Sequence, residues 1–179
     1  GSAGFGVPLI IQGKANAAKD YAEYDSLDAV LEAGFTSDTP VYKQCAKLFI
    51  QEDRPNKVAI CVGTGKVTET LNLIKAQDFR QIIPVFGTED DTLKELATYV
   101  EATEDRMLFV KVSDTSSLEA VGKMDRTLGI VYAGEEEGVE GALVGATAGY
   151  TAGSFTYKNI ILKGIEPELL TDSQIEAIH

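Results

Sequence analysis

The chain has 179 residues, 44% of them hydrophobic and 25% charged, which suits a single globular domain with one continuous core. Its formal net charge of −12 argues against nucleic-acid binding, because a phosphate-binding surface needs a basic face that releases counterions. No stretch approaches the roughly 20 apolar residues that span a bilayer, so we expect no membrane partner. The two cysteines, Cys45 and Cys61, are predicted to be buried reduced thiols.

The first half of the chain alternates between apolar runs and helical patterns. In chain order we expect a strand at Val7–Gln12, a helix from Ser26 to Gly34, a helix from Pro40 through Val41, Cys45, Leu48 and Phe49, a strand at Lys57–Val62, and a helix through Val67, Leu71 and Ile74. Ser26 is an N-cap residue, Gly34 suits a helix end, and Pro40 suits a first helical position.

The alternation continues in the second half. We expect a strand at Gln81–Phe86, a helix that Asp90 or Asp91 caps and that carries Leu93, Leu96, Ala97 and Val100, a strand at Met107–Val112, a short helix at Ser116–Val121, and a strand at Thr127–Tyr132. Pro84 predicts an edge strand or a bulge, since proline cannot donate to a ladder. The glycine- and glutamate-rich run 133–138 is the expected mobile loop.

Repeated strand–helix alternation with near-continuous apolar strands is typical of a mostly parallel sheet that helices cover on both faces. The sequence therefore predicts an α/β fold, a three-layer sandwich, built as one domain over residues 1–179.

Small residues dominate the stretch from Gly138 to Gly149, where Gly138, Gly141, Gly145 and Gly149 recur every three or four residues. Glycine inside a helix costs about 1 kcal/mol relative to alanine. Such a repeat is expected only where another backbone packs very close to the helix. We consider two partners for this face: the helix's own sheet, or another subunit.

The last residues predict a strand at Asn159–Leu162 and then a helix. Thr171 or Asp172 is a ready N-cap, and Leu170, Ile175 and Ile178 fall near helical spacing. Such a helix would be short, and no glycine, asparagine or proline closes it. We therefore expect the chain to be a piece of a larger protein.

The residues that could carry chemistry point away from an enzyme. The turn Val62-Gly63-Thr64-Gly65-Lys66 follows a strand, but a phosphate loop needs glycine at Ile60 and serine or threonine at Val67. His179 is the only histidine, which leaves no catalytic triad and no zinc site. The acidic runs at Glu89-Asp90-Asp91, Glu104-Asp105 and Glu135-Glu136-Glu137 are interpreted as solvated charge. We expect no catalytic, cofactor-binding or metal-binding residue.

Three tyrosines, Tyr21, Tyr24 and Tyr42, precede or begin the second helical segment. They are either interface anchors, where tyrosine is enriched, or half-buried residues at the edge of the core.

Four short motifs lie along the chain in a definite order. They are Tyr24-Asp25-Ser26-Leu27-Asp28-Ala29-Val30, Ser37-Asp38-Thr39-Pro40-Val41-Tyr42-Lys43, Arg54-Pro55-Asn56-Lys57-Val58-Ala59-Ile60, and Gly153-Ser154-Phe155-Thr156-Tyr157-Lys158. The last is followed by a strand, by Gly164-Ile165-Glu166-Pro167 and by a Leu-Thr-x-x-Gln segment at 170–174. In order and spacing, over most of the chain, they resemble the family of contractile phage-tail sheath proteins.

This resemblance implies a structural virion protein of a phage, a prophage or a related contractile injection system. Subunits of that family polymerise into stacked rings around a tail tube, and contraction drives the tube into the host. Assembly takes place in the bacterial cytoplasm. The chain would cover the central α/β region, without most of the N-terminal arm and without the C-terminal region whose strands link neighbouring subunits.

Two other functions remain open. A doubly wound enzyme or small-ligand binder would use the loops after Val62, Phe86, Val112 and Tyr132, at the carboxyl ends of the strands. A receiver-like regulatory domain would use Asp114 as its acceptor.

Overall fold

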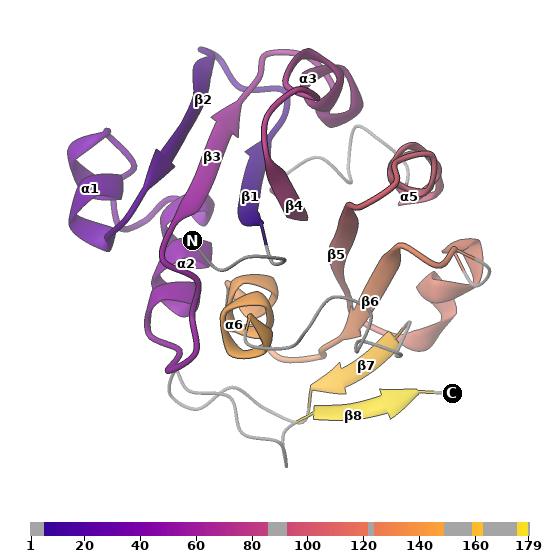
Figure 1. Ribbon diagram of the computed structural model, residues 1–179. Helices are drawn as coiled ribbons and strands as arrows, with labels where there is room; N and C mark the ends of the chain where they lie inside the picture. Colours follow the sequence, from indigo (N-terminus) through magenta and orange to yellow (C-terminus); the bar gives the residue numbers. More distant parts are fainter. Residues whose placement is uncertain (1–5, 86–92, 122–123, 149–158, 163–174, 179) are drawn as a thin grey trace.

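A computed structural model of the chain describes residues 6–85, 93–121, 124–148, 159–162 and 175–178 (Figure 1). The elements in chain order are β1 (Val7–Gln12), β2 (Lys19–Tyr24), α1 (Leu27–Glu32), α2 (Pro40–Phe49), β3 (Val58–Val62), α3 (Val67–Leu73), β4 (Phe79–Val85), α5 (Leu93–Glu101), β5 (Met107–Val112), the 3-10 helix η1 (Thr115–Val121), β6 (Thr127–Val131), α6 (Val139–Thr147), β7 (Asn159–Leu162) and β8 (Ile175–Ile178).

The strands form one sheet in the order β2-β3-β1-β4-β5-β6-β7-β8. The six inner strands pair in parallel, and β2 and β8 pair antiparallel at the two ends. Every residue of β3 and β6 is buried, as expected for strands with helices on both faces. The predicted α/β fold with a mostly parallel sheet is confirmed.

Two hydrophobic cores lie on opposite faces of the sheet, because successive side chains of a strand point to opposite sides. In β1, Ile10 belongs to one core, while Leu9 and Ile11 belong to the other. The first core is completed by α1, α2 and α6, and the second by α3, α5 and η1. Figure 1 shows these two helix layers flanking the sheet, which makes the predicted three-layer sandwich.

The predicted starts of the first two helices are confirmed by their capping bonds. The Ser26 hydroxyl accepts from the Ala29 amide at 3.1 Å, and Gly34 follows α1 with a φ of +100°. Pro40 begins α2 after Thr39, whose hydroxyl accepts from the Tyr42 amide at 3.2 Å. Cys45 and Cys61 are buried free thiols, as predicted. Asp90 and Asp91, the expected caps of α5, lie outside the described residues.

The prediction that Pro84 marks an edge strand is wrong. Pro84 lies in β4, an inner strand between β1 and β5, and it is opposite Ile11 of β1. The β4–β5 pairing involves only Gln81 and Ile82, so it has ended before the chain reaches Pro84. An inner strand therefore accommodates the proline because the ladder on one side stops short of it. The register irregularity of β4 lies earlier, between Phe79 and Ile82.

The prediction of a C-terminal helix through Ile175 and Ile178 is also wrong. These two residues begin and end β8, which pairs antiparallel with the predicted and confirmed strand β7. The spacing of three fits a helix, but an available sheet edge decides the conformation of so short a segment, and isoleucine suits a strand. Thr171 and Asp172, the expected caps, lie outside the described residues.

The glycine-rich helix packs closely on a neighbouring helix of the same chain. A Cβ at Gly145 would lie 2.6 Å from the backbone oxygen of Leu48 in α2, and a Cβ at Gly141 would collide with that of Gln44. The Gly141 amide donates to the Gln44 side-chain oxygen at 2.7 Å. At these two positions the glycine face of α6 therefore packs on α2, and not on the sheet or on another subunit. Gly149 lies outside the described residues.

Candidate functional site

The glycine-rich turn after β3 has a structural role. The Gly63 amide donates to the Gln12 carbonyl at 2.8 Å. The carbonyls of Gly63 and Gly65 accept from Ala15 and Lys14, so the turn is bonded to the loop after β1. A side chain at Gly63 would collide with Thr70 of α3. Glycine is therefore required at position 63 because the strand, the loop and the helix pack closely there.

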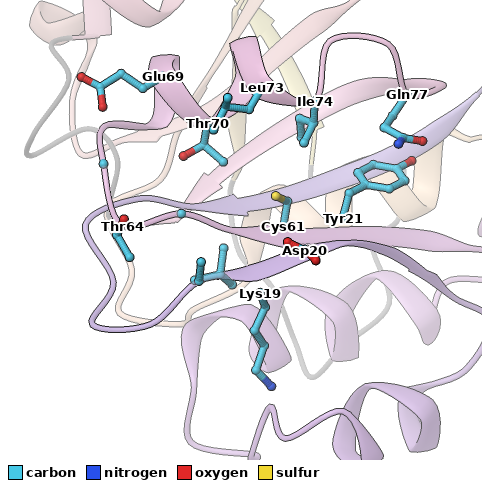
Figure 2. A pocket seen from close by; sticks show the side chains of 14 residues that line it. Lys19, Asp20, Tyr21, Cys61, Thr64, Glu69, Thr70, Leu73, Ile74 and Gln77 are labelled. Atoms are coloured by element: carbon cyan, nitrogen blue, oxygen red, sulfur yellow. The ribbon is translucent and has the colours of Figure 1, made fainter.

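A groove of about 550 Å³ lies beside this turn. We call it the β2–α3 groove: β2 supplies Asp20 and Tyr21, β3 supplies Cys61, and α3 supplies Thr70 and Leu73. Figure 2 shows these side chains around one open space, with the turn 63–65 at one end and Gln77 toward the other. Among the described residues, the loop after Val62 is the only one of the four strand-end loops of a doubly wound binder that contributes to it.

An irregularity in β2 directs two consecutive side chains toward the groove. Lys19 is opposite Val62 and Ala22 is opposite Ile60, so three steps along β2 match two along β3. A bulge of this kind re-aims side chains that would otherwise alternate. Lys19 points away from the groove in Figure 2, and its ammonium donates to the Ala33 carbonyl. Asp20 and Tyr21 both line the groove.

The groove lacks an activated nucleophile among the described residues. Burial raises the pKa of the Cys61 thiol, and the neighbouring charge of Asp20 raises it further. Burial also raises the pKa of the Tyr21 hydroxyl, which donates to Glu23 at 3.1 Å. Both groups therefore stay protonated at neutral pH. Neither the Cys61 thiol nor the Tyr21 hydroxyl is activated as a nucleophile or a general base.

The acidic loop after β6 is bonded to α2. Glu137 pairs with Lys43 at 2.5 Å, and Glu136 pairs with Lys47 at 2.7 Å. The hydrogen bond to Lys47, followed by its charge, lowers the pKa of Glu136. These exposed carboxylates meet lysines across a shallow depression that Tyr42 also lines. The loop that we expected to be mobile therefore has defined partners on α2.

The remaining candidate residues have structural contacts. Asp114, the acceptor of the receiver-like hypothesis, accepts from the amide and the hydroxyl of Ser116 at the start of η1. Tyr24 meets Phe35 edge to face, and Tyr21 lies 6.2 Å from the ring of Phe79. Tyr21, Tyr24 and Tyr42 are all half-buried, which fits the core-edge interpretation. The run 89–91, the loop position after Phe86, and His179 lie outside the described residues.

Glu140 is a buried carboxylate that sequence reasoning missed. It lies in α6, where Gln44 of α2 hydrogen-bonds to it. Burial raises its pKa, while its own backbone bond, Gln44 and the charge of Lys111 in β5 oppose that effect. Its only sequence signal is a glutamate next to glycines in an otherwise apolar helix.

We expect Glu140 to make the free energy of unfolding depend on pH. In the unfolded chain the carboxyl ionises near 4.5, whereas the folded chain keeps the proton to higher pH. Above 4.5 the folded state therefore binds more protons, and stability falls by at most about 1.4 kcal/mol per pH unit until the folded group ionises. Chemical denaturation between pH 4 and 8 should show this slope in the wild type.

The variant Glu140→Gln should lose that contribution and be more stable than the wild type at neutral pH. Glu135→Gln, at an exposed carboxylate before α6, is the matched control and should keep the wild-type slope. Equal slopes for Glu140→Gln and the wild type would contradict the assignment.

Comparison with known protein families finds no family model that matches the chain, and comparison with curated proteins finds no similar sequence. Across the described ranges, no helix is both long and apolar enough to cross a membrane. In the same part of the chain, no three histidine, cysteine, aspartate or glutamate side chains are grouped as a metal site would require.

Proposed function

We propose that the chain is the central α/β region of a structural subunit similar to those of contractile phage-tail sheaths. The observation that carries this proposal is the ordered series of four motifs. Three of them fall at boundaries between elements: Ser26 caps α1, Thr39 caps α2, and the segment 54–57 leads into β3. Residues with such roles would be retained in a subunit that works through its shape.

The architecture is compatible with a rigid building block. Helices cover both faces of the sheet, and the two cores are continuous from β1 outward. A packed interior of this kind transmits strain rather than absorbing it, which a contracting assembly requires. The partners under this proposal are other copies of the subunit, stacked in rings, and a tail tube protein. The site of action is the virion, after assembly in the host cytoplasm.

Electron microscopy of the full-length protein tests the proposal. We expect helical tubes or sleeves, and with the cognate tube protein a filled sleeve of regular diameter. The 179-residue chain is the matched control, and it should stay dispersed because the family's linking strands lie outside the region it resembles. A full-length protein that remains a monomer, and that a nucleotide stabilises against heat, would contradict the proposal.

A second candidate function, small-ligand binding by a doubly wound domain, is favoured by one observation. The β2–α3 groove adjoins the loop at the carboxyl end of β3, where such folds place ligands, and its volume lies within the range of ligand pockets.

A further inference from the structure

The β2–α3 groove has an apolar wall on its helix side. Leu73 of α3 is 84% exposed, and Ile74 beside it is half-buried against the second core. A single exposed leucine is common on protein surfaces. This leucine, however, stands at the rim of an opening of about 550 Å³, within the size range of pockets that bind small molecules. A ligand seated there would cover an aliphatic surface that water now contacts.

The opposite side of the groove carries negative charge. The bulge in β2 places the exposed Asp20 in the lining, and Glu69 of α3 lies at the end formed by the turn 63–65. The two lysines closest in sequence are held elsewhere: the Lys19 ammonium lies 4.4 Å from the Phe35 ring centre on the other core, and Lys66 bonds to Glu95 at 3.4 Å. Within the described residues Asp20 forms no salt bridge.

At the other end of the groove, charged residues outside the lining act on Tyr21. After burial, the hydrogen bond to Glu23 and the charges of Glu23 and Asp78 raise the pKa of Tyr21, and only Arg106 acts in the opposite direction. Arg106 is itself bonded to the carbonyls of Phe79, Lys75 and Gln77. The charged side chains of the lining are Asp20, Glu69 and Lys19, and the Lys19 ammonium is held at the Ala33 carbonyl, so the groove favours a cation over an anion.

We propose that the β2–α3 groove binds an organic cation, an ammonium or guanidinium group on an aliphatic stem, with the cation at Asp20 and the stem along Leu73. A charged head and an apolar stem match the two sides of the groove, and long cationic side chains bind to proteins in the same way. This chemistry is shared by free amines and by the lysine or arginine side chain of a partner polypeptide. The site does not depend on assembly into a sheath.

Nuclear magnetic resonance titration of the 15N-labelled chain tests this site. The probes are n-butylguanidinium, which is a free monocation with a four-carbon stem, and N-acetyl-arginine amide, which presents the same head on a peptide unit. Pentanoate, with a similar stem and the opposite charge, is the control ligand. We expect both or one of the cations to shift the amide signals of Asp20, Tyr21, Gly65 and Leu73, and pentanoate to leave them in place.

Two variants separate the head from the stem. Asp20→Asn should weaken cation binding at least fivefold, and Leu73→Ser should weaken it about threefold, since one exposed leucine buries only part of its surface. Asp25→Asn, just after β2 and outside the groove lining, is the matched control and should bind like the wild type. The side chains of Asp20 and Leu73 are both exposed, so the spectra of these two variants should be unchanged away from the groove.

The pattern of probes identifies the source of the cation. Binding of n-butylguanidinium alone supports a small free cation, and binding of the arginine amide supports a side chain of a partner. The proposal is overturned if neither cation shifts these signals at about 10 mM, if pentanoate binds as tightly, or if Asp20→Asn binds like the wild type.

Discussion

Replacing Gly141 by alanine should destabilise the protein by about 2–4 kcal/mol, although alanine is the better helix former by about 1 kcal/mol. The added methyl group would collide with the backbone oxygen of Gln44, which no side-chain rotation can relieve. Helices α2 and α6 would have to separate. The bond from the Gly141 amide to Gln44 would then lengthen inside a buried interface, at a cost of about 1 kcal/mol.

Urea denaturation of wild type and variant measures this effect. Gly65→Ala is the matched control, because the Cβ there would meet the end of the flexible side chain of Glu69. We expect the control to change the free energy of unfolding by less than about 1 kcal/mol. If Gly141→Ala is as stable as the wild type, or more stable, the close packing of α6 on α2 is not what requires glycine.

Replacing Arg106 by alanine should cost about 2–4 kcal/mol, because one side chain connects three backbone carbonyls before β5. Its guanidinium donates to Phe79 at 3.1 Å, to Lys75 at 2.9 Å and to Gln77 at 2.6 Å. It also lies 3.7 Å from the centre of the buried Phe79 ring. Hydrogen bonds to charged groups contribute about 1.5–3 kcal/mol each when buried, and partial exposure lowers this value here.

Arg54→Ala is the control for Arg106→Ala. Arg54 also lies over a phenylalanine, at 4.8 Å from the ring centre of Phe49, but its described backbone bond is to the adjacent Pro55. Its loss should cost about 1 kcal/mol or less. Arg106→Lys should fall between the two, since lysine keeps the charge without the planar fork. Equal losses for Arg106→Ala and Arg54→Ala would show that the three carbonyl bonds contribute little.

Local signals in the sequence were sufficient for most elements of the fold. Apolar runs such as 58–62 are buried strands, as predicted, because a strand that helices cover on both faces carries apolar residues at every position. Ser26 and Pro40 marked helix starts correctly, since a capping bond and the fixed φ of proline act within a few residues of the chain. The class of fold follows from the order of these elements.

The groove was not predicted, because it depends on a register rather than on a motif. No strand was predicted at 19–24, and only the bulge of β2 against β3 places Asp20 and Tyr21 in the same lining. The Gly63–Gly65 turn has the appearance of a phosphate loop but lacks the flanking residues of one, and its Gly63 amide and its Gly63 and Gly65 carbonyls bond to the end of β1 and the loop after it.

The sequence by itself determined where most strands and helices of the described region begin, because propensity, capping and periodicity act within a few residues; β2 (Lys19–Tyr24) is an exception, since no strand was predicted there. Only the tertiary structure decided that the segment 175–178 is a strand, that Pro84 lies in an inner strand, and that the partner of Gly141 is α2. Each of these outcomes depends on an edge, a ladder length or a helix surface supplied by residues far away in the chain. Such long-range contacts leave no periodic trace in the segment that makes them.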